Sequence, residues 1–207
     1  MKTKKLAKTG IIVVITLLMN SCASSYSTIN PDRLNYISND ISQEVTLEYK
    51  YGLLESKYAK KEVKRGVRLI AVKITNNSKK DLVFGKDITL TYENGNELSF
   101  LENKKTYSTL KQNTLGYLFY LLLTPMTFNK TSATNNGIET NSTPIGYAVG
   151  PGLAFGNMIA AGSANKKFKK ELLDYNIFGT TINSGKTVVG LIGVYSYSYD
   201  ALKLKIE

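Results

Sequence analysis

Apolar and polar residues alternate with a period of two in the segment 45–51. Val45, Leu47, Tyr49 and Tyr51 are apolar or aromatic, and the residues between them are polar or charged. Successive side chains of a strand point to opposite faces, so this alternation predicts a strand with one buried face. A strand of this kind needs paired neighbours and a layer over its apolar face, which favours a fold built on antiparallel sheets.

Further strand patterns lie on both sides of a long central segment. The sequence predicts early strands within 66–78, 81–85, 87–92 and 98–101, and late strands within 187–197 and 202–206. The pair Asn94-Gly95 is a strong signal for a tight turn between two strands. Six or seven short strands at this spacing predict a mainly β chain with an antiparallel β-sandwich.

The first 21 residues form three zones. Four lysines within the first eight residues precede the apolar segment 11–19, and Asn20 and Ser21 follow. The apolar segment is shorter than the about 20 residues that cross a bilayer. This layout is typical of a signal peptide, which we place at 1–21; the alternatives are an N-terminal core helix or a true membrane anchor.

The stretch Met19-Asn20-Ser21-Cys22 resembles the lipobox of bacterial lipoproteins, and the polar residues behind it resemble lipoproteins of the Bacteroidota. The resemblance implies that Cys22 is joined to diacylglycerol, that the chain is cut before it, and that the new amine is acylated, for example with palmitate. The following residues are polar, contain Pro31 and show no apolar period, so they predict a tether, which together with the lipidated cysteine we place at 22–41. The residues directly after Cys22 are Ala23-Ser24-Ser25, without an aspartate and without an acidic run. By the same resemblance, this favours the periplasmic face of the outer membrane.

The order of strands resembles a family of small extracytoplasmic immunoglobulin-like domains. The matching stretches are "VKITNNS" early, "NSGKTVVG" late and the closing "LKLKI". The resemblance implies an immunoglobulin-like β-sandwich over 42–207 that binds or scaffolds, and it supplies no catalytic residue. The difference from this family is a long insert at about 113–175, between the middle and late strands.

Composition excludes several classes of chemistry. The chain has no histidine, and its single cysteine is the one assigned to the lipid. Nucleophile–histidine pairs and histidine–thiolate metal sites are therefore excluded, and we expect no enzyme activity, no cofactor and no metal. The formal net charge is +11. For an exported chain, this charge points to anionic lipids or glycans of the envelope rather than to nucleic acid.

The insert is the most unusual part of the sequence. No charged residue occurs within 112–129 or within 140–165, and a polar stretch separates these two blocks. The second block predicts a helix that begins at Gly150, with Pro151 at its first position, and extends to about Tyr175. The sequence therefore predicts a long, helical, apolar insert in the sandwich.

Small and cationic residues in this helix are the candidate contact residues. Gly150, Gly152 and Gly156 provide small surfaces that allow close packing. The cations that follow are Lys166, Lys167, Lys169 and Lys170. An apolar helix with a cationic end favours contact with an anionic membrane or a protein partner. The alternative is a helix that packs on its own sandwich and ends in solvated lysines.

Two further patterns have a functional and a structural interpretation. The segment 57–68 holds six cations and one acid, which suits envelope anions but is also typical of a solvated loop or strand edge. Tyr195, Tyr197 and Tyr199 would share one side of a strand, where they could stack on sugars or lie half-buried against a neighbouring sheet.

Taken together, these patterns predict a non-enzymatic, lipid-anchored binding or scaffolding module. A membrane-active insert and a glycan-binding module are the alternatives.

Overall fold

The computed structural model of the protein describes residues 22–134 and 137–207. The predicted signal peptide, 1–21, lies outside the described residues. The chain divides into two compact units. In the described chain, the insert unit comprises Asn113–Ser163 together with residues 22–25, and the sheet unit comprises Tyr26–Gln112 and Ala164–Glu207.

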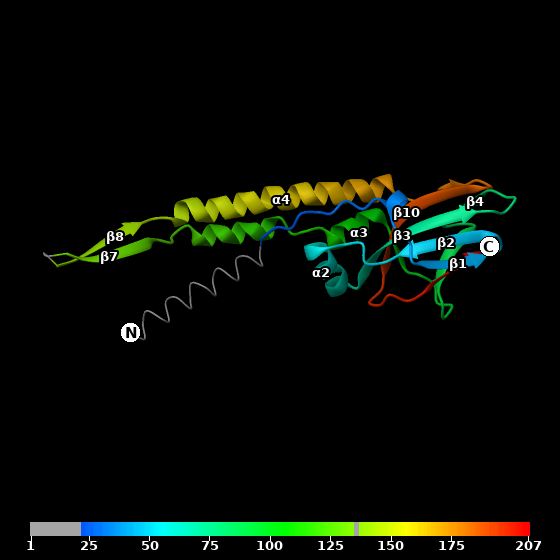
Figure 1. The fold of residues 1–207 in the computed structure, drawn as a ribbon, viewed down its shortest axis with the longest axis horizontal. Helices are drawn as coiled ribbons and strands as arrows, with labels where there is room; N and C mark the ends of the chain where they lie inside the picture. Colours follow the sequence, from blue (N-terminus) through cyan, green and yellow to red (C-terminus); the bar gives the residue numbers. More distant parts are fainter. Residues whose placement is uncertain (1–21, 135–136) are drawn as a thin grey trace. The chain divides into compact units, whose positions relative to one another are not determined.

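The helices and strands are distributed unequally between the two units (Figure 1). The strands of the sheet unit are β1 (Ser38–Ser42), β2 (Val45–Lys50), β3 (Val67–Asn76), β4 (Leu82–Val83), β5 (Ile88–Tyr92), β6 (Phe100–Leu101), β9 (Thr181–Ile182), β10 (Lys186–Tyr195) and β11 (Leu202–Ile206). Its helices are η1 (Pro31–Arg33), α2 (Ser56–Arg65), α3 (Asn103–Leu110) and the last part of α4 (Gly146–Asp174). The insert unit contains η2 (Leu115–Leu123), β7 (Phe128–Thr134), β8 (Gly137–Thr143) and the first part of α4.

The sheet unit is built on a five-stranded antiparallel sheet in the order β1-β2-β3-β10-β6. Strands β3 and β10 pair along their whole length, with Val67 opposite Tyr195 and Asn76 opposite Lys186. Two smaller antiparallel pairs, β5 with β11 and β4 with β9, belong to the same unit. The predicted β-rich, antiparallel class is thus confirmed, and the arrangement is compatible with a β-sandwich.

Both faces of the large sheet are covered. Along β3, Ile70 and Val72 belong to a core cluster shared with β5, β11, β4 and β9. The alternate residues Leu69 and Ala71 belong to a second cluster shared with α2, α3 and α4. Burial on both faces explains why this strand is almost continuously apolar in sequence.

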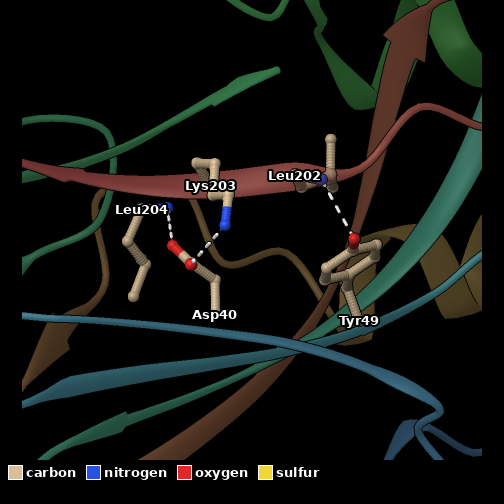
Figure 2. A network of polar contacts seen from close by, with 5 residues as sticks. All are labelled: Asp40, Tyr49, Leu202, Lys203 and Leu204. Atoms are coloured by element: carbon tan, nitrogen blue, oxygen red, sulfur yellow. Dashed lines mark hydrogen bonds and ion pairs between the residues drawn. The ribbon is translucent and has the colours of Figure 1, made fainter. Parts of the chain in front are cut away.

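Side chains from β1 and β2 accept hydrogen bonds from backbone N–H groups of β11. Asp40 accepts a hydrogen bond from the backbone N–H of Leu204 at 2.8 Å and forms an ion pair with Lys203 at 3.2 Å (Figure 2). The hydroxyl of Tyr49 accepts a hydrogen bond from the N–H of Leu202 at 3.0 Å. These contacts join the last strand to the large sheet and occupy donors that an edge strand otherwise exposes.

The cationic segment 57–68 is not the loop or strand edge that its composition suggested. Its residues up to Arg65 form α2, and β3 begins at Val67. Tyr58 and Glu62, one turn apart, form the buried side of α2, whereas Lys60 and Lys64 are exposed. Gly66 ends the helix in the left-handed conformation with φ of 59°, where glycine is favoured. The helix was missed because its buried side contains only two side chains, one of them acidic.

The insert also differs from the long apolar helix that the sequence predicted. It contains η2, a β-hairpin formed by β7 and β8, and α4, whose last part belongs to the sheet unit. Helix α4 begins at Gly146 rather than Gly150, so Pro151 lies inside the helix and not at its first position. Every residue described in β7 and β8 is exposed. Such strands have no alternating pattern, and the hairpin was therefore predicted only as a polar stretch.

The segment assigned to the tether packs on the sheet unit. Tyr26 and Ile29 are buried beside α2 and α4. The carboxylate of Glu171 accepts a hydrogen bond from the hydroxyl of Tyr26 at 2.6 Å and one from the N–H of Ile29 at 3.0 Å. Residues 38–42 form β1. The chain behind Ser25 is therefore part of the folded unit.

Candidate functional site

The insert unit has a small core of its own, formed where η2 lies along α4 (Figure 1). Tyr117 and Tyr120 of η2 are buried with parallel rings 6.4 Å apart, and Ala154 and Ala161 of α4 pack with them. A Cβ atom at Gly146 would lie 2.3 Å from the backbone oxygen of Leu123. Small residues on one side of α4 therefore allow the two helices to approach closely.

The outer surface of this unit is also apolar. Among the described residues, thirteen of the twenty exposed large apolar side chains fall within 115–159. On η2 the most exposed are Leu115 at 67%, Phe119 at 76% and Leu122 at 73%; on α4, Phe155 is 53% and Ile159 74% exposed. Large exposed apolar patches often mark contacts with a membrane or a partner, so this set of side chains is the candidate contact site. We refer to it as the apolar surface, consisting of Leu115, Leu118, Phe119, Leu121, Leu122, Met126, Phe128, Ile138, Ile145, Tyr147, Val149, Phe155 and Ile159.

Charge is nearly absent from residues 113–163 of the same unit. Residues 113–163 include one cation, Lys130, and one anion, Glu139, and both lie in the β-hairpin. The η2 and α4 parts of the unit therefore have no charged side chain with which to bind a ligand by an ion pair. The chemistry available to this surface is burial of apolar area.

The described chain begins in the insert unit. The backbone N–H of Ala23 donates a hydrogen bond to the side-chain oxygen of Asn157, and the amide of Asn157 donates to the backbone oxygen of Leu153 at 2.7 Å. Ala23 also packs against the small core of the unit. Cys22 is half-buried and directly precedes this contact. The residue predicted to carry lipid is thus held beside the first part of α4.

The three predicted glycines have two different environments. A Cβ atom at Gly150 would lie 2.9 Å from the side chain of Thr124, so Gly150 belongs to the packed side of α4. At Gly152 and Gly156 a Cβ atom would contact nothing within 4 Å. The glycines do not form one seam, because Gly150 faces η2 and the other two lie on the exposed side.

The predicted lysines are exposed and belong to the part of α4 in the sheet unit. Lys166, Lys167, Lys169 and Lys170 surround the buried Phe168 of the same helix segment. Lys170 pairs with Asp174, and this ion pair raises the pKa of the lysine. Lys169 lies 5.8 Å from the ring centre of Tyr107 on α3. These lysines belong to a different unit from the apolar surface, so the structure does not join them to it in one site.

A groove beside α3 has a basic rim. It has a volume of about 510 Å³, and its lining includes Lys104, Lys111 and Lys169 together with the apolar Tyr107 and Leu172. None of its lining residues is acidic. In this groove one of the predicted lysines, Lys169, lies with two other cations around the ring of Tyr107. Sequence spacing gave no sign of this arrangement.

No family model, no curated protein and no solved structure matches this chain. The case for a function therefore rests on the geometry of the two units.

Among the described helices, none combines the length and apolar character needed to cross a membrane. Within residues 22–134 and 137–207, no group of three or more acidic or cysteine side chains could hold a metal ion.

The late tyrosines do not form the row that their spacing suggested. Strand β10 ends at Tyr195, and Tyr197 and Tyr199 lie in the following loop. The ring of Tyr197 covers Gly66, and the guanidinium of Arg68 lies 4.4 Å from the ring centre of Tyr199. The alternation of tyrosine and serine looked like a strand, but the pairing of β10 with β3 stops at Val67.

The buried carboxylate of Glu62 has the strongest electrostatic perturbation among the acids. Burial raises its pKa to about 7, although the hydrogen bond from the N–H of Leu69 and the charge of Arg68 act in the opposite direction. The Leu69 N–H donates to Glu62 at 2.8 Å. This carboxylate joins α2 to β3, so its role is structural.

Replacing Glu62 by glutamine will flatten the dependence of stability on pH. Because the pKa is higher in the folded state, the folded protein binds a proton that the unfolded chain releases between about pH 4.5 and 7, and stability falls as pH rises through this window. We expect Glu62→Gln to remove roughly 2 kcal/mol of this loss between pH 5 and pH 8. Urea unfolding of wild type and variant at both pH values measures it. The exposed Glu97→Gln is the control, and an unchanged pH slope in Glu62→Gln would contradict the assignment.

Proposed function

We propose that this chain is a lipid-anchored lipoprotein of a bacterial cell envelope, and that it binds or scaffolds through its insert and is not an enzyme. Cys22 is the lipid attachment site in this proposal. The sheet unit is the presented module, an immunoglobulin-like β-sandwich whose second face is covered by helices. The resemblance to lipoproteins favours an anchor in the outer membrane, facing the periplasm.

One observation carries the proposal: the residue assigned to the lipid and the apolar surface belong to the same unit. Ala23 is hydrogen-bonded to Asn157 of α4, so an acyl group on Cys22 would begin at the unit that carries this surface. A soluble protein rarely leaves so many large apolar side chains uncovered without a binding role. The position of the anchor gives this surface a membrane-proximal setting.

The acidic residues give no support to an enzymatic alternative. Glu62 is hydrogen-bonded to the backbone of β3, and Glu171 is hydrogen-bonded to Tyr26 and Ile29. Both carboxylates therefore stabilise the packing of helices and loops. We do not extend the proposal to sugar binding, because Tyr195, Tyr197 and Tyr199 do not lie along one strand.

Acylation of Cys22 tests the anchor directly. In cells that express the full chain and are fed a labelled fatty acid, we expect the wild type to incorporate label and Cys22→Ser to incorporate none. Only the cysteine thiol forms the thioether. The measurement is label in the purified protein together with its intact mass, since membrane fractionation alone does not separate lipid attachment from surface contact. Ser25→Ala is the matched control and should be labelled like wild type. Equal labelling of Cys22→Ser would refute the anchor.

A further inference from the structure

We propose that the apolar surface binds the lipid bilayer itself, with η2 and the first part of α4 lying in its interfacial region beside the acyl chains on Cys22. This inference deepens the proposed function, because it names what the insert contacts. It rests on the same lipid anchor, but the surface can be tested without the anchor.

The first argument is that the part of α4 in the insert unit is apolar on both sides. Its packed side carries Gly146, Gly150 and Ala154 against η2, and its outer side presents Phe155 and Ile159. A helix that is apolar all round is found in a protein core or in a membrane environment. In the insert unit, η2 covers only one side, so the outer side requires a second apolar medium.

The second argument concerns the charge pattern. Protein interfaces are usually rimmed by polar and charged side chains that select the partner. Within 113–163 the only charged residues are Lys130 and Glu139 in the hairpin, and η2 and the first part of α4 have none. Such a surface selects by apolarity alone, which matches lipid tails better than a specific protein.

The third argument is the location of the anchor. The lipid on Cys22 must enter a bilayer, and Ala23 is held on α4 by its hydrogen bond to Asn157. The insert unit is thereby brought to the same bilayer. Since none of the described helices is long and apolar enough to cross a membrane, the contact is an interfacial one, with apolar side chains reaching about 5–10 Å into the boundary between head groups and acyl chains.

The test uses the chain from residue 22 to 207 with Cys22→Ser, which lacks any acyl group. We expect this chain to sediment with phosphatidylcholine vesicles. Sedimentation should be the same in low salt and in about 0.5 M salt, because salt does not screen the burial of apolar area. A triple variant, Phe119→Ser, Leu122→Ser and Ile159→Ser, should partition about 1000-fold more weakly, since each of the three buried side chains contributes about a factor of ten.

A matched control replaces three equally exposed apolar side chains of the sheet unit, Ile37, Ile41 and Val63, by serine. This control should bind vesicles like the parent chain. All variants should keep their thermal unfolding midpoint, because the substituted side chains are exposed. The chain has no tryptophan, so Phe119→Trp introduces a single reporter, whose emission should shift to shorter wavelength when vesicles are added.

Three results would overturn the inference. One is failure of the acyl-free chain to bind vesicles. If this chain instead forms a stable dimer and the triple variant is monomeric, the apolar surface contacts a second copy of the chain. Another is binding only to vesicles with phosphatidylglycerol and only at low salt, which would assign the contact to lysines. The third is equal weakening by the control variant. Each leaves the labelling of Cys22 untouched, so failure here is distinguishable from failure of the lipid anchor.

Discussion

Replacing Gly193 by valine will lower the free energy of unfolding of the sheet unit by about 3 kcal/mol. Gly193 lies in β10, where α3 approaches the sheet, and a Cβ atom there would be 2.1 Å from the hydroxyl oxygen of Thr106 and 2.8 Å from its methyl carbon. Thr106 is itself fully buried, so it has no open space to move into. The valine must push α3 away from the sheet, and chemical unfolding monitored by circular dichroism measures the loss.

A second glycine and a double variant control this experiment. A Cβ atom at Gly162 of α4 contacts nothing within 4 Å, and Gly162→Ala should therefore stabilise by about 0.5–1 kcal/mol. Thr106→Ala should recover part of the loss caused by Gly193→Ala, because it removes the two closest atoms. Additive effects of these two substitutions would show that the close approach of α3 is not the cause.

Replacing Asn165 by leucine will destabilise the sheet unit by about 3 kcal/mol, because three buried hydrogen bonds are lost. The side-chain oxygen of Asn165 accepts from the N–H of Gln112 at 2.7 Å and from the hydroxyl of Tyr58 at 3.0 Å. Its amide donates to the backbone oxygen of Gln112 at 2.9 Å. Gln112 directly precedes the segment 113–163 of the insert unit, and Asn165 lies two residues after the end of this segment. These hydrogen bonds therefore hold the two ends of the segment together.

Two further variants separate hydrogen bonding from packing. Asn165→Asp keeps the acceptor but places a second carboxylate oxygen against the carbonyl of Gln112, so we expect a loss at pH 7 that shrinks at low pH, where the protonated acid donates. Asn176→Leu replaces an exposed asparagine near the end of α4 and should change the unfolding free energy by less than about 0.5 kcal/mol. If Asn165→Leu were equally mild, the assigned hydrogen bonds would contribute little.

The strands of the sheet unit were largely predictable because their signal is local. The alternation that begins at Val45 corresponds to β2, the apolar run within 66–78 contains β3, and the final strand lies at Leu202–Ile206 as expected. Alternating burial follows from the geometry of a single strand, so it is written in neighbouring residues. Pairing partners are not local, and the sequence did not indicate that β10 lies between β3 and β6.

The candidate site was only partly predictable. An uncharged insert at about 113–175 was visible in the sequence, but its division between two units was not. The lysines at 166–170 follow the apolar block along the chain, which suggested one continuous contact surface. In the structure Phe168 and Leu172 of this segment are buried in the core of the sheet unit, because a helix face is decided by what packs against it.

By itself, the sequence determined the antiparallel β class and the presence of a long insert with few charges, because these signals are local in the chain. Its composition also excluded chemistry that needs a histidine or a thiol other than that of Cys22. Only the tertiary structure decided which apolar residues are covered. Tyr26 and Ile29, in a polar segment, are buried, whereas Phe119 and Ile159, in apolar segments, are exposed. Burial depends on contacts between residues far apart in the chain, and hydropathy cannot report these.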